Sequence, residues 1–309
     1  MWRKHQGAGS ISLLFFFCLT LGCERTKEAD PSDTRPVVVT SIFPIGDLTQ
    51  QLTGELVRVE VLLPPGASPA TFDVTPRQLR DLQRAGLYLM IGGGLDEWVA
   101  KFPTASGGDS PVIRLSEGIP LLAEEEGEDG HDHGSGNPHI WLDPVLVRDL
   151  ILPKLDDALQ RAFPDAAELI GNRATLLADS LTSLDEEIRE ALRPLDRRAF
   201  ISTHSAWTYF AARYGLEEAG VIHAHPGQDP SSRELAALLE IARARGISCL
   251  FTEPQLGEVA ARALATELSL PTCMLDPLGG PNQEGREGYF QLLRFNTRQL
   301  IQGLGGSGS

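Results

Sequence analysis

The chain has 309 residues, of which 42 are acidic and 27 are basic, and its formal net charge is −15 at neutral pH. This acidic balance excludes nucleic acid as a partner, because binding to the phosphate backbone requires clustered positive charge. The length exceeds what one hydrophobic core holds comfortably, so we expect two domains.

The first residues are arranged like a secretory signal. Arg3 and Lys4 precede an apolar run from Ile11 to Leu21, and Gly22 and Cys23 follow it. The run is too short to span a membrane, which takes about 20 residues. The Gly-Cys pair resembles a bacterial lipobox, so we predict that residues 1–22 are removed and that a lipid on Cys23 anchors the exported chain to a membrane. The mature protein then carries a formal charge of −17.

Residues 23–35 are polar and have no apolar period, as expected of a flexible tether. We predict a first α/β lobe over residues 36–160, with a helix that starts at Thr75-Pro76 and ends at Gly86. Strands are expected at 37–41, 57–63, 87–91 and 112–115. Strands that alternate with helices favour a parallel sheet.

A segment inside this lobe, residues 124–138, is rich in Gly, acidic residues and His, and we predict a mobile loop there. His131 and His133 suit transient capture of a cation. A merely solvated run of charge explains the same composition, and the sequence leaves both interpretations open.

Residues 164–193 contain no internal proline, and their apolar residues keep a helical spacing. We predict one long, rigid linking helix there and a second α/β lobe over residues 197–305. Ser231 and Glu234 form a capping box at the start of a helix in that lobe. Its strands are expected at 199–203, 219–222, 249–252 and 272–275. The predicted fold is therefore two parallel-sheet α/β lobes joined by one long helix, with a cleft between the lobes.

Two further cysteines, Cys249 and Cys273, lie in apolar runs typical of strands. In an oxidising compartment they could pair. Two buried thiols fit the sequence equally well, and we do not assign either residue to a metal.

Polar side chains stand at the predicted strand ends and just after the predicted mobile loop. His204 and Glu253 each follow a strand, Asp276 follows the last strand, and His139 follows the loop. In parallel α/β lobes, ligands bind beyond the carboxyl ends of the strands. Two imidazoles with one or two carboxylates are typical ligands of a divalent first-row transition metal.

The chain resembles the cluster A-I solute-binding proteins of ABC transporters, the zinc and manganese receptor family, over nearly all of residues 36–305. The segments that carry the resemblance are Ile42-Phe-Pro-Ile-Gly-Asp-Leu, Leu63–Pro76, Gly92-Gly-Gly-Leu-Asp-Glu-Trp, Asn137-Pro-His-Ile-Trp-Leu-Asp-Pro, Ser202–Phe210, Phe251-Thr-Glu-Pro-Gln and Leu275-Asp-Pro-Leu. The resemblance implies a metal held between two lobes, capture outside the cell and delivery to a membrane permease.

The family's metal ligands match this chain unevenly. His139 and His204 match its second and third ligand positions, and Asp276 matches the fourth. The first position does not match, because Ala70 stands where the family usually has His. Glu253 remains divided between a metal role, either as a direct ligand or as a support for one, and a polar cap for the helix that begins near Pro254.

Three hypotheses address the missing first ligand. The site could use His139, His204 and Asp276, with a water or a second carboxylate oxygen in the remaining position, as other three-ligand sites do. His223 or His225, which follow a predicted strand, could supply the fourth ligand. Finally, the metal function could be lost or altered.

Imidazole ligands favour zinc, whereas manganese prefers a set richer in carboxylates. We therefore expect Zn²⁺, with Mn²⁺ as the alternative cargo.

The expected protein is a monomeric, periplasmic or cell-surface lipoprotein that is bound to the membrane through its lipid alone. It delivers metal to an ABC transporter permease. The alternatives are a metal chaperone or adhesin on the same fold, and a zinc hydrolase. We predict no enzyme, because the usual zinc-hydrolase and serine-hydrolase motifs are absent.

Overall fold

The computed structural model describes residues 1–2, 33–75, 78, 85–101, 109–123, 136–223 and 228–305. The predicted signal, Cys23, most of the tether, His131, His133, His225 and residues 124–135 of the predicted loop lie outside these ranges. Residues from Arg35 onward belong to one unit of the chain. Within the described ranges, none of the helices combines the length and the apolar character that crossing a membrane requires.

The first sheet is parallel and has the strand order β2-β1-β3-β4. Its strands are β1 (Val37–Thr40), β2 (Arg58–Val61), β3 (Ala85–Met90) and β4 (Val112–Arg114). All four residues of β1 are buried, as expected of a central strand that is covered on both faces. The prediction that a helix ends at Gly86 was wrong, because Gly86 lies inside β3. Its backbone conformation suits the strand, and the apolar residues that follow it belong to the same strand.

The second sheet repeats this arrangement with the order β6-β5-β7-β8, again with all strands parallel. Its strands are β5 (Ala199–Ser202), β6 (Glu217–Val221), β7 (Leu250–Thr252) and β8 (Thr272–Met274). In both sheets the chain order reverses beside the first strand of the lobe, which is where α/β folds place their ligands.

Helices surround and connect the sheets. The α-helices are α1 (Phe43–Thr53), α4 (Pro144–Leu146), α5 (Leu152–Ala162), α6 (Ala167–Leu192), α7 (Thr208–Tyr214), α8 (Ser232–Arg245), α9 (Val259–Leu268) and α10 (Tyr289–Leu304), and the shorter helices are η1 (Gly54–Leu56), η3 (Glu97–Ala100), η4 (Ile140–Leu142), η5 (Val147–Ile151) and η6 (Pro164–Ala166). The capping box of α8 is confirmed, since Ser231 and Glu234 exchange both bonds.

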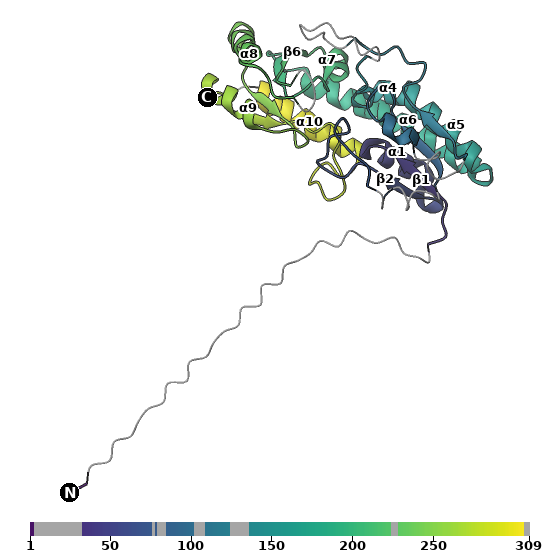
Figure 1. The fold of residues 1–309 in the computed structure, drawn as a ribbon. Helices are drawn as coiled ribbons and strands as arrows, with labels where there is room; N and C mark the ends of the chain where they lie inside the picture. The colour runs from purple at the N-terminus through teal and green to yellow at the C-terminus, as the bar shows by residue number, and fades with distance from the viewer. Residues whose placement is uncertain are drawn as a thin grey trace. The chain divides into compact units, whose positions relative to one another are not determined.

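The long helix α6 has 26 residues, which corresponds to a rod of roughly 39 Å. Its buried stripe, Ile170, Ala174, Leu177, Leu181, Leu184, Ile188 and Leu192, packs against α1 and α5 of the first lobe and α7 and α10 near the second. Figure 1 shows α5 and α6 beside α1, β1 and β2, and α8 and α9 at the other end of the same unit. The predicted architecture of two lobes and one long helix is therefore confirmed.

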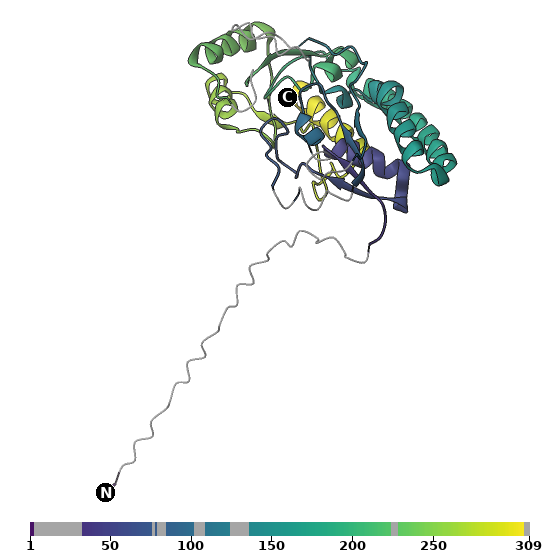
Figure 2. The ribbon, with the colours of Figure 1, turned by 45° about the vertical axis from the view of Figure 1, so that its right-hand side comes forward.

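The last helix, α10, is a second connection between the lobes. It contacts β8, α6 and α1, and Figure 2 shows it in yellow between them. Buried hydrogen bonds add to this connection: the Trp141 indole donates to Pro277 O at 2.7 Å, and the Tyr289 hydroxyl donates to Trp141 O at 2.8 Å. These bonds hold the segment around Trp141 against the second lobe.

Candidate metal centre

His139 comes from the segment that follows the first sheet and leads into η4. Its side chain is oriented by Asn137, whose Oδ1 lies 2.9 Å from His139 Nδ1 and accepts the His139 backbone N–H at 3.0 Å. The Asn137 amide donates in turn to Ser205 O at 2.6 Å, which fixes which of its atoms is the oxygen. His139 Nδ1 must therefore be the donor, and Nε2 carries the lone pair.

His204 follows β5 and is oriented by a carboxylate. Glu253, at the end of β7, places Oε2 2.6 Å from His204 Nδ1, and its side chain is fully buried. This contact orients the ring so that its other nitrogen, Nε2, is turned toward His139. A histidine held by a carboxylate in this way is the arrangement found around protein-bound metals.

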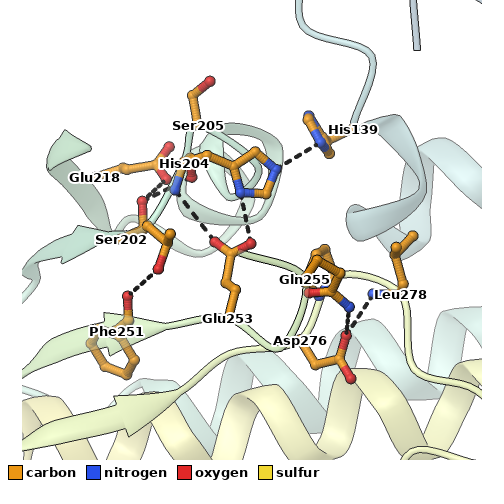
Figure 3. A network of polar contacts seen from close by, with 12 residues as sticks. His139, Ser202, His204, Ser205, Glu218, Phe251, Glu253, Gln255, Asp276 and Leu278 are labelled. Carbon is orange, nitrogen blue, oxygen red and sulfur yellow. Dashed lines mark hydrogen bonds and ion pairs between the residues drawn. The ribbon is translucent and has the colours of Figure 1, made fainter. Parts of the chain in front are cut away.

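The two Nε2 atoms face each other at a distance of 3.2 Å, one from each lobe. Figure 3 shows both rings turned toward this point, with Glu253 on the far side of the His204 ring. Burial, and secondarily the neighbouring His204, lowers the pKa of His139 well below its ordinary value, so this ring is neutral near pH 7. A proton carried by one of the two rings, or a cation in its place, joins the two nitrogens across this distance.

The separation fits a tetrahedral zinc ion. Zn–N bonds of about 2.0–2.1 Å at a tetrahedral angle place two ligand nitrogens roughly 3.3–3.4 Å apart. The pair of histidines could therefore accept the metal with almost no movement of the rings.

A cavity of about 50 Å³ adjoins the two imidazoles, and its lining includes Ala70, Leu95, Gln255 and Leu278. Ala70 thus lies beside the histidines, as the family's first ligand position would. Its loop is held in place, because the Trp98 indole donates to Pro69 O at 3.2 Å. The space can hold water, which needs about 10–15 Å³ per molecule measured in this way.

Asp276 lies near the site but is bound by other groups. Its Oδ1 accepts from the Gln255 side chain at 2.8 Å and from the backbone N–H groups of Leu278 and Gly279 at 3.0 Å each. Its Oδ2 accepts from Arg286 at 2.6 Å, where the Asp276 side chain is 2% exposed and the Arg286 side chain 11% exposed. Gln255 lines the cavity in its place (Figure 3). The metal role predicted for Asp276 stays a prediction.

His223 follows β6 and is buried, with Nδ1 at 2.9 Å from Gln228 O. The part of the cavity wall that the structure describes does not include it. His225 lies outside the described residues, so its predicted role is not tested. Among the residues that the structure covers, no group of three or more His, Cys, Asp or Glu side chains is arranged to hold one metal ion. The described site therefore consists of two facing imidazoles.

Sequence reasoning missed the supporting residues Asn137, Arg286 and Glu218. Glu218 accepts hydrogen bonds from Ser202 at 2.6 Å and from Thr208 at 3.0 Å, and burial raises its pKa to about 7. The spacing of Asn137 two residues before His139 was visible in the sequence and is the signal that could have identified it. No comparable signal marks Arg286, which meets Asp276 only through the loop between them.

Comparisons with known proteins agree with this arrangement. The family model described as zinc-uptake complex component A periplasmic (ZnuA) matches residues 38–303. The zinc-binding lipoprotein AdcA of Streptococcus pneumoniae (strain ATCC BAA-255 / R6) is 28% identical over 94% of the chain. The chain spans only 60% of that protein's length.

The high-affinity zinc uptake system protein ZnuA of Bacillus subtilis (strain 168) is 27% identical, over 98% of this chain and 99% of its own. A crystal structure of ZnuA superposes with a TM-score of 0.77 at 28% identity, covering 87% of this chain and 99% of its own. The match to the family model extends over most of the chain, including both sheets, α6 and the two facing histidines. The chain belongs to the family of the zinc-uptake complex component A periplasmic proteins.

Proposed function

We propose that the chain captures zinc outside the cytoplasm between His139 and His204 and passes it to an ABC permease. One observation carries the zinc site: the Nε2 atoms of His139 and His204 face each other across 3.2 Å, and the opposite nitrogen of each ring lies against a side-chain oxygen, of Asn137 or of Glu253. Such a pair is stable when a cation lies between the rings. The names of the relatives support zinc as that cation.

Water completes the coordination sphere in this proposal. Ala70 offers no ligand atom, and Asp276 could reach the metal only after exchanging its bond with Arg286. The cavity beside the histidines has room for the water that an open zinc site requires.

The same contacts favour zinc over manganese. Manganese prefers carboxylate oxygen, and both nearby carboxylates have other partners. Glu253 accepts from His204 Nδ1, and Asp276 accepts from Arg286. The ligand atoms that face each other beside the cavity are imidazole nitrogens, which suit zinc.

Glu253 is also the reason we propose a receptor rather than a zinc hydrolase. A hydrolase needs a base beside the metal-bound water. Glu253 instead holds the far side of the His204 ring, with its side chain fully buried.

We also propose that the exported protein is a monomer and that a lipid on Cys23 anchors it to the membrane.

Calorimetric titration of the purified mature protein tests the site. We expect one zinc per chain, and we expect His139→Ala and His204→Ala each to weaken binding by more than the 10–100-fold that loss of a supporting residue costs. His223→Ala is the matched control, because His223 is a buried histidine outside the described cavity wall, and this variant should bind zinc like the original. Unchanged affinity in both cavity variants would refute the assignment.

A further inference from the structure

Cys249 and Cys273 lie next to each other in the second sheet. Cys249 immediately precedes β7, and Cys273 lies in the neighbouring strand β8, opposite Phe251. Side chains alternate between the two faces of a sheet, so Cys249, Phe251 and Cys273 share one face. All three belong to the main hydrophobic core, and Cys249 and Phe251 pack against Gly303 of α10.

The two sulfur atoms are 2.7 Å apart. A disulfide bond is about 2.05 Å long, so the sulfurs would have to approach each other by roughly 0.7 Å. Cys249 is completely buried and Cys273 is 9% exposed. Neither cysteine lines the described wall of the cavity beside His139 and His204. The side chains are thus already brought together at a place that the metal site does not use.

We propose that Cys249 and Cys273 form a structural disulfide in the exported protein. This inference rests on the extracytoplasmic location in the proposed function, because disulfides persist in oxidising compartments. The oxidant is a disulfide of another thiol compound or of a dithiol protein. It gains the two electrons and two protons that the cysteines lose, its own S–S bond breaks, and it leaves as two thiols.

Cys273 is the cysteine that attacks first. The S–H group of Cys249 donates to Cys273 Sγ, and this hydrogen bond lowers the pKa of Cys273 and raises that of Cys249. The Cys273 thiolate attacks one sulfur of the oxidant and expels the first thiolate. Cys249, after losing its proton, then attacks Cys273 Sγ in the mixed disulfide and expels the second. Cys273, which is 9% exposed, is also the sulfur that is more accessible to the oxidant, since Cys249 is completely buried.

The bond would close a loop that contains α9 and join the strands that lead to the metal site. Glu253 follows Cys249 by four positions, and Asp276 follows Cys273 by three. Linking β7 to β8 fixes the spacing of these two strand ends. A cross-link over about 25 residues also restricts the unfolded chain, which raises the stability of the fold.

Tryptic mapping tests the bond directly, because Arg262 separates the two cysteines. Cleavage at Arg245, Arg262 and Arg286 places Cys249 on residues 246–262 and Cys273 on residues 263–286. The full chain is recovered from the extracytoplasmic fraction, alkylated at once and digested. We expect the two peptides as one joined species, which separates into two on reduction. Both cysteines alkylated without reduction, even after incubation with oxidised glutathione, would overturn the proposal.

Thermal unfolding gives a second measurement. Dithiothreitol should lower the melting temperature of the original chain by several degrees and leave the Cys249→Ala/Cys273→Ala variant unchanged. Equal responses of the two proteins would contradict a structural bond. Zinc titration of the original chain and of the Cys249→Ala/Cys273→Ala variant separates the disulfide proposal from the proposed zinc function. If the oxidised original chain bound no zinc, only the proposed zinc function would be contradicted.

Discussion

Two carboxylates leave neighbouring strands of the second sheet and have different partners. Glu253 follows β7 and pairs with Nδ1 of His204, so its carboxylate supports an imidazole that faces the first lobe. Asp276 follows β8 and accepts from Arg286, Gln255 and two backbone N–H groups. One carboxylate therefore supports a histidine of the proposed metal site, and the other is neutralised within its own lobe.

The difference shows that position in the sheet does not decide what an acidic residue does. Both side chains are buried, and a buried carboxylate needs a partner that offsets its loss of hydration. A histidine as partner turns the carboxylate into part of a metal site. An arginine as partner turns it into part of the folded framework.

The largest effect that separates the two residues is expected for Glu253→Gln. The variant removes the charge that holds His204 with its Nε2 lone pair toward the cavity, so zinc affinity should fall by about 10–100-fold. Calorimetric titration measures this change. Glu240→Gln, at an exposed residue of α8, is the control, and equal affinities in the two variants would mean that Glu253 does not support the site.

A gain of affinity is expected for Ala70→His. The new imidazole would line the same cavity as His139 and His204, and a third nitrogen ligand should tighten zinc binding by about tenfold. Thr71→His, on the same loop but outside the described cavity wall, should leave affinity unchanged. No difference between these two variants would mean that the missing first ligand is already replaced.

The smallest effect on zinc is expected for Asp276→Asn. Its affinity should stay within about threefold of the original, while the free energy of unfolding in urea should fall by about 3 kcal/mol because Arg286 loses its buried counter-charge. Glu253→Gln should show the opposite order of effects. A tenfold loss of zinc affinity in Asp276→Asn would instead make Asp276 a ligand.

Much of the fold could be predicted because its signals are local. The apolar strands, the helical spacing of residues 164–193 and the Ser231 capping box each depend on neighbours in sequence. The error at Gly86 arose because glycine is compatible with both the end of a helix and a strand.

The site was only partly predictable for a related reason. His204 follows a strand, and His139 matches a ligand position of the family that the chain resembles, so the two could be expected to lie close together. Which partner a carboxylate meets depends on tertiary packing instead. Arg286 reaches Asp276 across ten residues, through a loop in which Gly279 and Gly280 have positive φ. Neither composition nor periodicity reports that contact.

The most direct test of the central claim is an anomalous diffraction map of crystals grown with zinc. We predict one zinc peak about 2.0–2.1 Å from both His139 Nε2 and His204 Nε2, with Arg286 still bound to Asp276. A zinc ion bound elsewhere, or one held by Asp276 after it has left Arg286, would contradict the account.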